Sequence, residues 1–317
     1  MTSGPRRVGA IDCGTNSIRL LVADVGDDGG LTDLDRRMEI VRLGQGIDVS
    51  GRIAPEAMER TLAATRVYAA RCRELGTEAV RFVATSASRD ASNADEFVAG
   101  VREAFGDLDV TPEVVAGAAE AELSFTGATG DLPGIGAEGP YLVVDLGGGS
   151  TEVVRGTGHV EESVSVDVGS VRITERHLHG DPPTDDEVVA ARADIATTLN
   201  AVEEQVDLTG LGTVVGLAGS ITTITAHALR LGSYDRDAVH HARLSPDRHR
   251  AACRELWGMT RAERAALPYL HPGRVDVIGA GALVWHEVLG RVAVRSPGVD
   301  VVTSEHDILD GIALSLT

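Results

Sequence analysis

The hydrophobic and polar positions of this chain change period along its length and predict alternating strands and helices. Near the N-terminus, "VGAIDC" and "IRLLVADV" are short runs of branched apolar residues, separated by the turn-forming letters "GTNS". The run "MEIVRL" predicts a third strand. Pro55 then begins "PEAMERTLAATRVYAARCREL", whose apolar residues recur at helical spacing up to Gly76, the expected helix stop.

The pattern continues to a segment rich in glycine and proline. "AVRFVAT" predicts a strand, "SNADEFVAGVREAF" a helix, "VTPEVV" a short strand and "AAEAELSFTGAT" a helix. Residues 130–140, "GDLPGIGAEGP", then predict a linker. We therefore expect one domain over residues 1–129 and a second over residues 130–317, with a final helix at about 305–317 as a candidate to pack back on the first domain.

After the linker the same order of predicted strands and helices begins again. "YLVVDL", "STEVVRG" and "HVEESVSVDV" predict three strands, and Thr184 with Glu187 forms a capping box that opens the helix "TDDEVVAARADIATTLNAVEEQV". "GTVVGLAGS" predicts a strand that runs into a glycine turn, followed by the helix "ITTITAHAL". The remaining pattern predicts a helix in "RVDVIGAGALVWHEVLGRV", a strand in "VDVVTS" and a last helix in "EHDILDGIALSL".

The two halves repeat one unit. Asp12 and Asp145 stand at equivalent points, 133 residues apart (145 − 12). This period is far longer than that of a solenoid repeat and indicates a duplicated domain. The mixed order of strands and helices favours an α/β fold with sheets covered by helices.

The amino-acid composition excludes several classes of binding partner and binding site. The net charge of −19 argues against nucleic acid and against an anionic membrane as partners, and no apolar run reaches the ~18 residues that span a bilayer. The chain has three widely spaced cysteines and no signal-peptide pattern, which indicates a cytoplasmic protein. It contains no lysine, so a P-loop is excluded, and an anionic substrate would need arginine or a bound cation.

The hairpin turns "DCGTNS" and "DLGGGSTE" carry the candidate chemistry. Glycines let the backbone approach an anion closely, and successive N–H groups with nearby hydroxyls form an anion nest. Asp145 and Glu152, with Asp12 as a third candidate, could hold Mg²⁺ (or Mn²⁺) that bridges to phosphate. A third turn places Gly219 and Ser220 at the start of a helix, where the dipole favours phosphate, although a purely structural role stays open. The predicted phosphate-binding residues of the two hairpins are Gly14, Thr15, Asn16, Ser17, Gly147, Gly148, Gly149 and Ser150.

Eight segments, in order along nearly the whole chain, resemble motifs of the exopolyphosphatase / guanosine pentaphosphate phosphatase family. They are "IDCGTNSIRLLV", "VATSASRDASNADEFV", "VVAGAAEAELSFTGA", "VVDLGGGSTEVV", "VDVGSVRITE", "GLAGSITTI", "RVDVIGAGALV" and "SEHDILDGIAL". The resemblance implies the fold of the actin, sugar kinase and acetate kinase superfamily, with two duplicated ribonuclease-H-like domains that face a central cleft.

The resemblance also implies roles for single residues. In "GAAEAEL" the family's general base falls on Glu120, whereas Ala119 stands where the family has another Glu. Glu122 lies roughly 200° round the helix from Glu120, so both cannot face one site. Arg89 matches a family arginine near the terminal phosphate. Arg19, after the first hairpin turn, and Ser170, in "VDVGSVRITE", are further candidates for phosphate binding.

The implied activity is an exopolyphosphatase that releases terminal orthophosphate from inorganic polyphosphate, with water activated by Glu120. Short polyphosphate chains are the expected substrate, since the chain ends after the core domains. Hydrolysis of guanosine penta- or tetraphosphate or other nucleotides stays open, as do a non-catalytic sensor and a homodimer. The histidines show no HExxH-type ligand pair and are expected to be non-catalytic, with His240 and His241 in a loop or at a domain edge.

Overall fold

The structure, a computed structural model, describes residues 5–26 and 29–316. Its chain divides into two compact units. Unit 1 comprises residues 1–127 and 308–317, and unit 2 comprises residues 128–307. The chain passes between the units near the end of one helix, α5 (Gly117–Thr129), and again just before the last helix, α13 (Ile308–Leu314).

Unit 1 is built on a five-stranded mixed sheet in the order β3-β2-β1-β4-β5. The first three strands are antiparallel neighbours, and β4 and β5 run parallel to β1. This is the ribonuclease-H-like order that the resemblance implied. The strands are β1 (Arg6–Cys13), β2 (Ser17–Val25), β3 (Leu31–Ile40), β4 (Ala79–Ala84) and β5 (Glu113–Val114).

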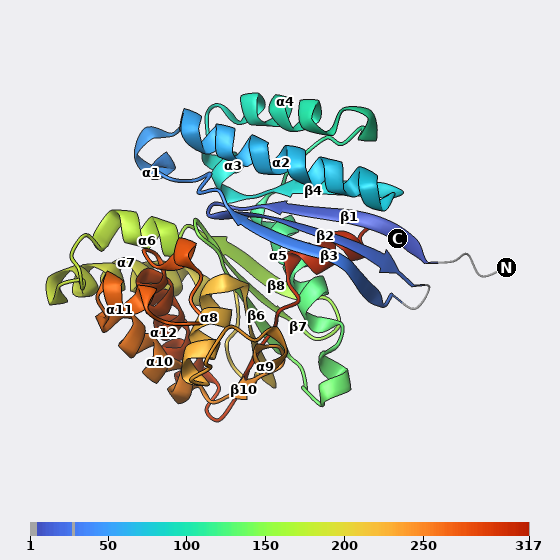
Figure 1. Ribbon diagram of the computed structural model, residues 1–317. Coiled ribbons are helices and arrows are strands. Elements are labelled where there is room, and N and C mark those ends of the chain that lie inside the picture. The colour runs from blue at the N-terminus through green and yellow to red at the C-terminus, as the bar shows by residue number, and fades with distance from the viewer. Residues whose placement is uncertain (1–4, 27–28, 317) are drawn as a thin grey trace. The chain divides into compact units, whose positions relative to one another are not determined.

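Alternating residues of β1 supply both faces of this sheet, because successive side chains of a strand point to opposite sides. Ile11 and Cys13 join the core under α2 (Pro55–Leu75) and α4 (Ala94–Phe105). Val8 and Ala10 join a second core with Leu123 of α5 and residues of α13. Figure 1 shows α2 and α4 on one face of the sheet and α13 on the other.

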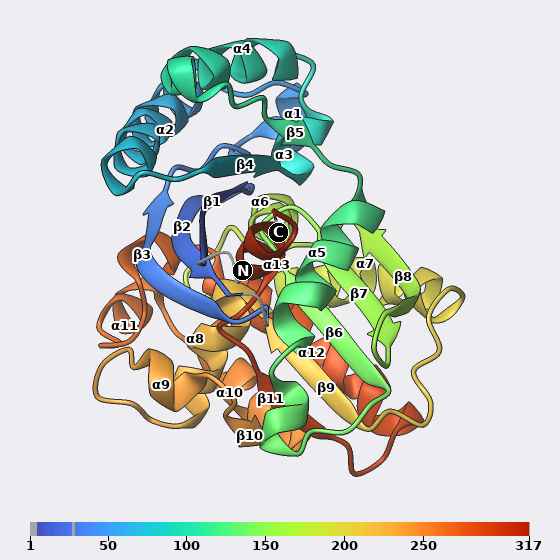
Figure 2. The same cartoon turned by 90° about the vertical axis from the view of Figure 1, so that its right-hand side faces the viewer.

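Unit 2 repeats this sheet and extends it. Its strand order is β10-β11-β9-β6-β7-β8, so the antiparallel β8-β7-β6 and the parallel β9 and β11 correspond to the five strands of unit 1. The edge strand β10 is added beside β11 (Figure 2). The strands are β6 (Tyr141–Leu146), β7 (Thr151–Gly156), β8 (Val160–Val166), β9 (Thr213–Leu217), β10 (Arg243–Leu244) and β11 (Asp300–Thr303).

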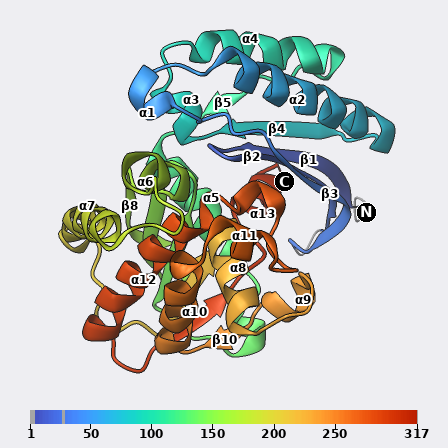
Figure 3. The same ribbon diagram turned by 60° about the vertical axis from the view of Figure 1, so that its left-hand side comes forward.

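One large apolar core lies between this sheet and its helices. Trp285 of α12 is fully buried in it, together with Leu142, Val144 and Leu146 of β6. Figure 3 shows α8, α10 and α12 close together. The longer helices are α6 (Ser170–His177), α7 (Asp185–Glu203), α8 (Ala218–Ala228), α10 (Pro246–Gly258) and α12 (Ile278–Arg295). The short ones are α1 (Ile47–Ser50), α3 (Ser86–Asp90), α9 (Arg236–Val239), α11 (Arg261–Ala265), η1 (Gly106–Leu108), η2 (Leu132–Ile135) and η3 (Pro272–Arg274).

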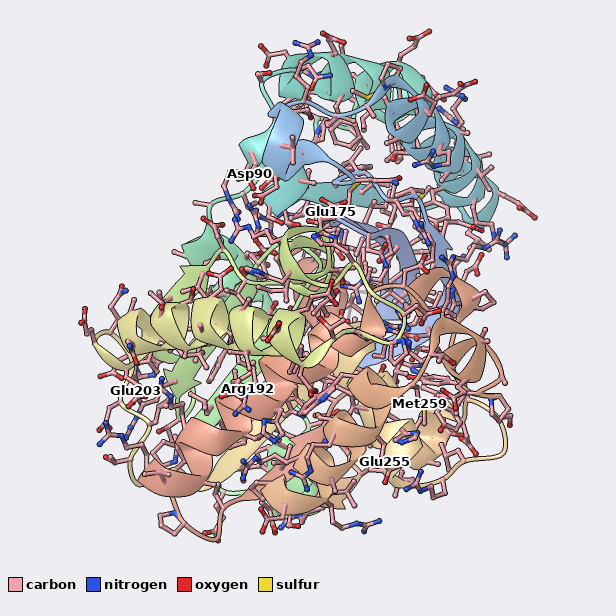
Figure 4. The ribbon with its side chains drawn as sticks, turned by 90° about the vertical axis from the view of Figure 1, so that its left-hand side faces the viewer. Asp90, Glu175, Arg192, Glu203, Glu255 and Met259 are labelled. Carbon is pink, nitrogen blue, oxygen red and sulfur yellow. The ribbon has the colours of Figure 1, made fainter. Side chains whose placement is uncertain are left out.

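Polar interactions determine where helix α7 begins and hold it against α12. The predicted capping box is present, with Thr184 and Glu187 bonding each other's backbone N–H groups. Ion pairs then tie α7 to α12: Arg192 pairs with Glu287, and Glu203 pairs with two arginines of α12. Figure 4 labels Arg192 and Glu203 on α7.

Several expected element boundaries were wrong. The third strand is β3 (Leu31–Ile40) rather than residues 38–43, because it is a largely exposed edge strand without an apolar run. The short strand of residues 110–115 is reduced to Glu113–Val114. Helix α8 begins at Ala218, three residues before the expected start at Ile221. Helix α13 begins at Ile308 rather than 305, since the Ser304 hydroxyl bonds the backbone of His306 and holds a turn there.

Among the described residues, no helix combines the length and apolar character needed to cross a bilayer. Cys13, Cys72 and Cys253 are free and buried.

Candidate active site

The two carboxylates of the unit 2 hairpin lie side by side. Asp145 on β6 is the direct antiparallel partner of Glu152 on β7, and opposite residues of such a pair point to the same face of the sheet. Their neighbours Val144 and Leu146 enter the helix-covered core, so the acids point to the other face. Asp145 is 7% exposed and Glu152 is 1% exposed. Ser165 on β8 donates a hydrogen bond of 2.7 Å to Glu152 Oε1.

The loop between these strands is held by the N-terminus of α6. The N–H of Ser170 donates to the Gly147 carbonyl, and the N–H groups of the next two residues donate to the Gly148 carbonyl. Arg172 Nε donates to the Gly149 carbonyl at 2.8 Å. Because these carbonyls are taken up by α6, the loop can meet an anion with N–H groups instead. Ser170 thus supports the loop, and Arg172, which the sequence analysis did not identify, does the same.

A glycine next to α6 makes this packing possible. A Cβ on Gly169 would lie 2.4 Å from the Gly148 carbonyl oxygen and 2.7 Å from the Gly149 nitrogen. Both atoms belong to the backbone and cannot rotate away. The sequence "VDVGS" therefore needs glycine for close approach between the helix start and the phosphate-loop candidate.

The unit 1 hairpin repeats this geometry with one change of charge. Gly14 N–H donates to the Ser17 carbonyl at 3.0 Å, and at the same offset Gly147 N–H donates to Ser150 at 3.0 Å. Asp12 is 4% exposed and pairs across the strands with Arg19, whose Nη2 lies 2.6 Å from Asp12 Oδ2. Arginine thus occupies the position of Glu152, because 152 − 19 is again 133.

The rest of the first hairpin is fixed to α3 and to the segment after β3. Thr15 Oγ1 lies 2.8 Å from the hydroxyl of Ser86. The Asn16 carbonyl accepts N–H groups of residues 41 and 42, and Gly44 packs directly on the Thr15 side chain. Ser17 is the first residue of β2 and is partly buried. The loop is thereby held by several independent contacts, which is what a binding loop requires to keep its N–H groups in place.

Glu120 is a buried carboxylate in the first turn of α5. It is 7% exposed, whereas Glu122 and Ala119 are exposed. The first turn of a helix favours negative charge. Arg89, at the end of α3, donates from Nη1 to Glu120 Oε2 at 3.3 Å and to the Val115 carbonyl at 3.0 Å. Helix α3 therefore connects two predicted features, since its Ser86 holds Thr15 and its Arg89 holds Glu120.

The third glycine turn forms the first turn of α8. Ala218 has a φ of 66°, in the left-handed region, and Gly219 and Ser220 follow it within the helix. A Cβ on Gly219 would lie 2.1 Å from the guanidinium carbon of Arg274, so this arginine lies over the turn. Sequence reasoning did not single out Arg274, although it is the first residue of the motif "RVDVIGAGALV", because the motif does not show which turn this arginine contacts. The N-terminus of α8 and the guanidinium of Arg274 both favour the binding of an anion at this turn.

Two predicted serines of unit 2 meet at a small residue of α12. A Cβ on Gly281 would lie 2.6 Å from Ser220 Oγ and 3.4 Å from the Cβ of Ser170. The structure therefore brings α6 with its loop, the first turn of α8 and the start of α12 together. In unit 1 it brings Asp12, Arg19, Thr15, Arg89 and Glu120 onto neighbouring elements.

The carboxylate oxygens of the two hairpins are the candidate ligands for a hard metal cation such as Mg²⁺. Asp145 and Glu152 offer carboxylate oxygens on one face of the sheet, and oxygen ligands are those that Mg²⁺ and Mn²⁺ prefer. The residues present therefore fit the ion. Asp12 fits less well, because Arg19 engages its Oδ2 through both Nε and Nη2.

Comparison with known proteins finds relatives along nearly the whole chain. Residues 21–316 match the Ppx/GppA phosphatase family. The chain is 51% identical to exopolyphosphatase 2 of Mycobacterium tuberculosis, over 98% of each chain. It is similar to the crystal structure of an exopolyphosphatase-like protein (TM-score 0.94, 43% identity, 99% of this chain and 98% of that one). It also resembles the Aquifex aeolicus Ppx/GppA family member (TM-score 0.79, 29% identity, 98% and 97%).

Proposed function

Because the chain belongs to the Ppx/GppA phosphatase family of hydrolases, we propose that it is an exopolyphosphatase that releases terminal orthophosphate from inorganic polyphosphate. The observation that carries the substrate class is its likeness, over nearly the full length, to a protein named exopolyphosphatase 2. The geometry of each unit supports the same chemistry, since each carries a closed glycine hairpin beside a buried acid.

In this proposal, backbone N–H groups and an arginine side chain bind the terminal phosphate. We assign this binding to N–H groups of residues 15–17 and 148–150, to the first turn of α8 with Gly219 and Ser220, and to Arg89. The N–H groups of Gly14 and Gly147 close the two hairpins instead. Ser170 contributes by fixing the second loop. Arg19 neutralises Asp12, so that this acid does not repel a phosphate at the first loop.

Glu120 acts as the general base in this proposal. A water oxygen attacks the terminal phosphorus, its proton passes to the Glu120 carboxylate, and the bond to the bridging oxygen breaks. The shortened polyphosphate leaves with that oxygen. Arg89 keeps the Glu120 carboxylate in place at 3.3 Å, so the base is oriented before the substrate arrives.

Asp145 and Glu152 would hold Mg²⁺ (or Mn²⁺), and when bound the ion supplies positive charge against the phosphate oxygens. Ser165 orients Glu152 for this role through its hydrogen bond. Such catalysis consists mostly of positioning and electrostatic stabilisation.

Short polyphosphate chains are the proposed substrate. The chain carries a net charge of −19 and no lysine, so its surface offers little to grip a long polyanion outside the site. Guanosine pentaphosphate would present the same terminal group, which makes it the alternative substrate to test.

The deciding experiment measures orthophosphate release from defined short polyphosphate, long polyphosphate and guanosine pentaphosphate, each with Mg²⁺ and with excess chelator. We expect Mg²⁺-dependent release, fastest per chain end from short polyphosphate. Faster turnover of guanosine pentaphosphate would assign the enzyme to that substrate instead. Binding of all three without release would leave a sensor and overturn the proposal.

A further inference from the structure

Unit 2 contains a cluster of one aspartate and three histidines that takes no part in the proposed reaction. Three imidazole nitrogens surround one oxygen, Asp131 Oδ2. His306 Nδ1 lies 2.8 Å from it, His241 Nε2 3.2 Å and His240 Nε2 3.4 Å. We call these four residues the Asp131 cluster.

The rings are packed more tightly than hydrogen bonding alone requires. The ring centroids of His240 and His241 are 3.6 Å apart in a stacked arrangement, and those of His240 and His306 are 4.5 Å apart. Two buried atoms, Asp131 Oδ1 and His241 Nε2, lack a hydrogen-bond partner of good geometry. Buried polar atoms are rarely left in that state, so a further partner is expected at this point.

Atoms able to bind a metal converge here. Asp131, His240 and His306 each offer a ligand atom, and these atoms all lie within 4.8 Å of one another. Imidazole nitrogen with one carboxylate oxygen is a ligand set that suits zinc and related transition metals better than Mg²⁺. This set therefore differs in kind from the all-oxygen pair of Asp145 and Glu152.

Both histidine ligands must change tautomer to bind a metal. The Nδ1 of His240 accepts a hydrogen bond of 3.1 Å from the backbone N–H of Glu305, so its neutral ring carries the proton on Nε2, which faces Asp131. Binding through Nε2 moves that proton to Nδ1 and breaks the bond to Glu305. His306 Nδ1 lies 2.8 Å from Asp131 Oδ2, and because a carboxylate oxygen accepts, this nitrogen also gives up its proton when it binds an ion.

The Asp131 cluster joins the two segments by which the chain enters and leaves unit 2. Asp131 lies shortly after the point where the chain enters unit 2 at residue 128, and His306 lies just before the point where it leaves at residue 307. His240 and His241 follow α9, far from both in sequence. An ion held by these residues would cross-link the entering and leaving segments.

We propose that Asp131, His240 and His306, with His241 beside them, form a binding site for a divalent transition metal of the zinc type that joins the two connecting segments of unit 2. The site lies outside the residues assigned to catalysis. Its ion would fix the two segments to each other, because Asp131 lies on the entering segment and His306 on the leaving one.

The test uses the full chain, stripped of metal with a chelator and kept in excess Mg²⁺ so that the oxygen site is occupied. Zn²⁺ is titrated in competition with a chromophoric chelator, and Co²⁺ binding is followed by its visible absorption. We expect one equivalent of Zn²⁺, Co²⁺ bands of a nitrogen- and oxygen-ligated ion, and a rise in melting temperature with Zn²⁺.

Asp131→Asn and His306→Ala should each weaken Zn²⁺ binding by at least ~100-fold, since even the partners of metal ligands contribute about 10–100-fold. His177→Ala is the matched control, because His177 Nε2 lies 2.8 Å from Asp194 Oδ2 in the same unit. Its affinity should equal that of the unchanged chain.

Two results would overturn the proposal: no stoichiometric Zn²⁺ or Co²⁺ binding by the unchanged chain, or equal affinity in Asp131→Asn and the unchanged chain. The first needs no variant, so it holds even if a substitution impairs folding.

Discussion

The Glu120 carboxylate is placed by its neighbours as much as by its helix. Its side chain is buried, Arg89 donates to it, and the following carboxylate, Glu122, faces solvent. Glu120→Gln keeps the shape and removes the base, so kcat should fall by roughly 10²–10⁴-fold. The measurement is phosphate release under saturating short polyphosphate.

Glu122→Gln is the control for this prediction and should leave kcat within twofold. Far-ultraviolet circular dichroism and the unfolding midpoint should match in both variants. If Glu122→Gln is the inactive variant, the assignment of the base within "GAAEAEL" is wrong.

Arg89 has two tasks that a point charge cannot both perform. It donates to Glu120 and to the Val115 carbonyl from one planar group, and it is assigned to the terminal phosphate. Arg89→Ala should lower kcat/KM by roughly 10–100-fold, which is what hydrogen bonds to charged groups contribute at about 1.5–3 kcal/mol. Arg89→Lys should recover only part of the loss, because lysine lacks the fork.

The exposed Arg66 on α2 provides the control for the loss of one positive charge. Arg66→Ala should leave kcat/KM unchanged within twofold. If Arg66→Ala and Arg89→Ala lowered kcat/KM equally, Arg89 would contribute only its positive charge and no specific contact with the phosphate.

At the scale of elements, α6 and the unit 2 hairpin act as one piece. Gly169 has extended backbone (φ −153°), so any residue could adopt its conformation, but a Cβ there would strike the Gly148 backbone. Gly169→Ala should destabilise the protein by about 1–3 kcal/mol, as overpacking does, and lower activity by displacing the loop. Denaturant unfolding and phosphate release measure the two effects.

Gly158, in the turn after β7, is the matched glycine because nothing lies within 4 Å of its added Cβ. Gly158→Ala should change neither quantity. Full activity in Gly169→Ala would mean that the loop position does not matter for catalysis.

The anchoring of α7 on α12 should depend on pH. Burial alone would raise the pKa of Glu203, but hydrogen bonds from Arg295 and Arg291 bring it below the usual value. A lowered pKa means that the contribution to stability is present above the unfolded pKa of about 4.3 and is lost as pH falls through the folded value.

Glu203→Gln should therefore reduce the free energy of unfolding by about 1 kcal/mol at pH 7 and by much less near pH 3. The neighbouring exposed Glu204 gives the control, and Glu204→Gln should be neutral at both pH values. A difference between Glu203→Gln and the unchanged chain that stays constant with pH would contradict the assigned cause.

Sequence patterns predicted most elements, because buried strands and amphipathic helices leave a period in the apolar residues. The edge strand β3 left such a pattern only near its end, since it is half exposed and rich in charged residues. Local spacing also could not reveal Arg274 over Gly219 or the approach of His306 to Asp131, 175 residues away. Those contacts arise from tertiary folding, and no short-range pattern encodes them.

At the scale of the whole molecule, the duplication is close in geometry but not in charge. The same cross-strand position holds arginine in one hairpin and glutamate in the other, so Asp12 is neutralised while Asp145 gains a second acid. The cross-strand pair of unit 1 is thus neutral, whereas that of unit 2 is suited to a cation. This division follows from a single substitution between equivalent positions, 19 and 152.

The last prediction concerns how an acidic protein captures a polyanion. The net charge of −19, with arginine as the only strongly basic side chain, opposes the approach of polyphosphate at long range, and salt screens this repulsion over about 8 Å at physiological ionic strength. Binding itself would rest on short-range contacts of loop N–H groups, Arg89 and a metal, which salt weakens less. Initial rates at sub-saturating short polyphosphate, with free Mg²⁺ held constant, should therefore stay level or rise as monovalent salt increases to physiological strength. An enzyme with a broad basic surface would lose rate steeply under the same conditions. A steep fall here would show that a positive surface dominates capture and would contradict the assignment of binding to these local groups.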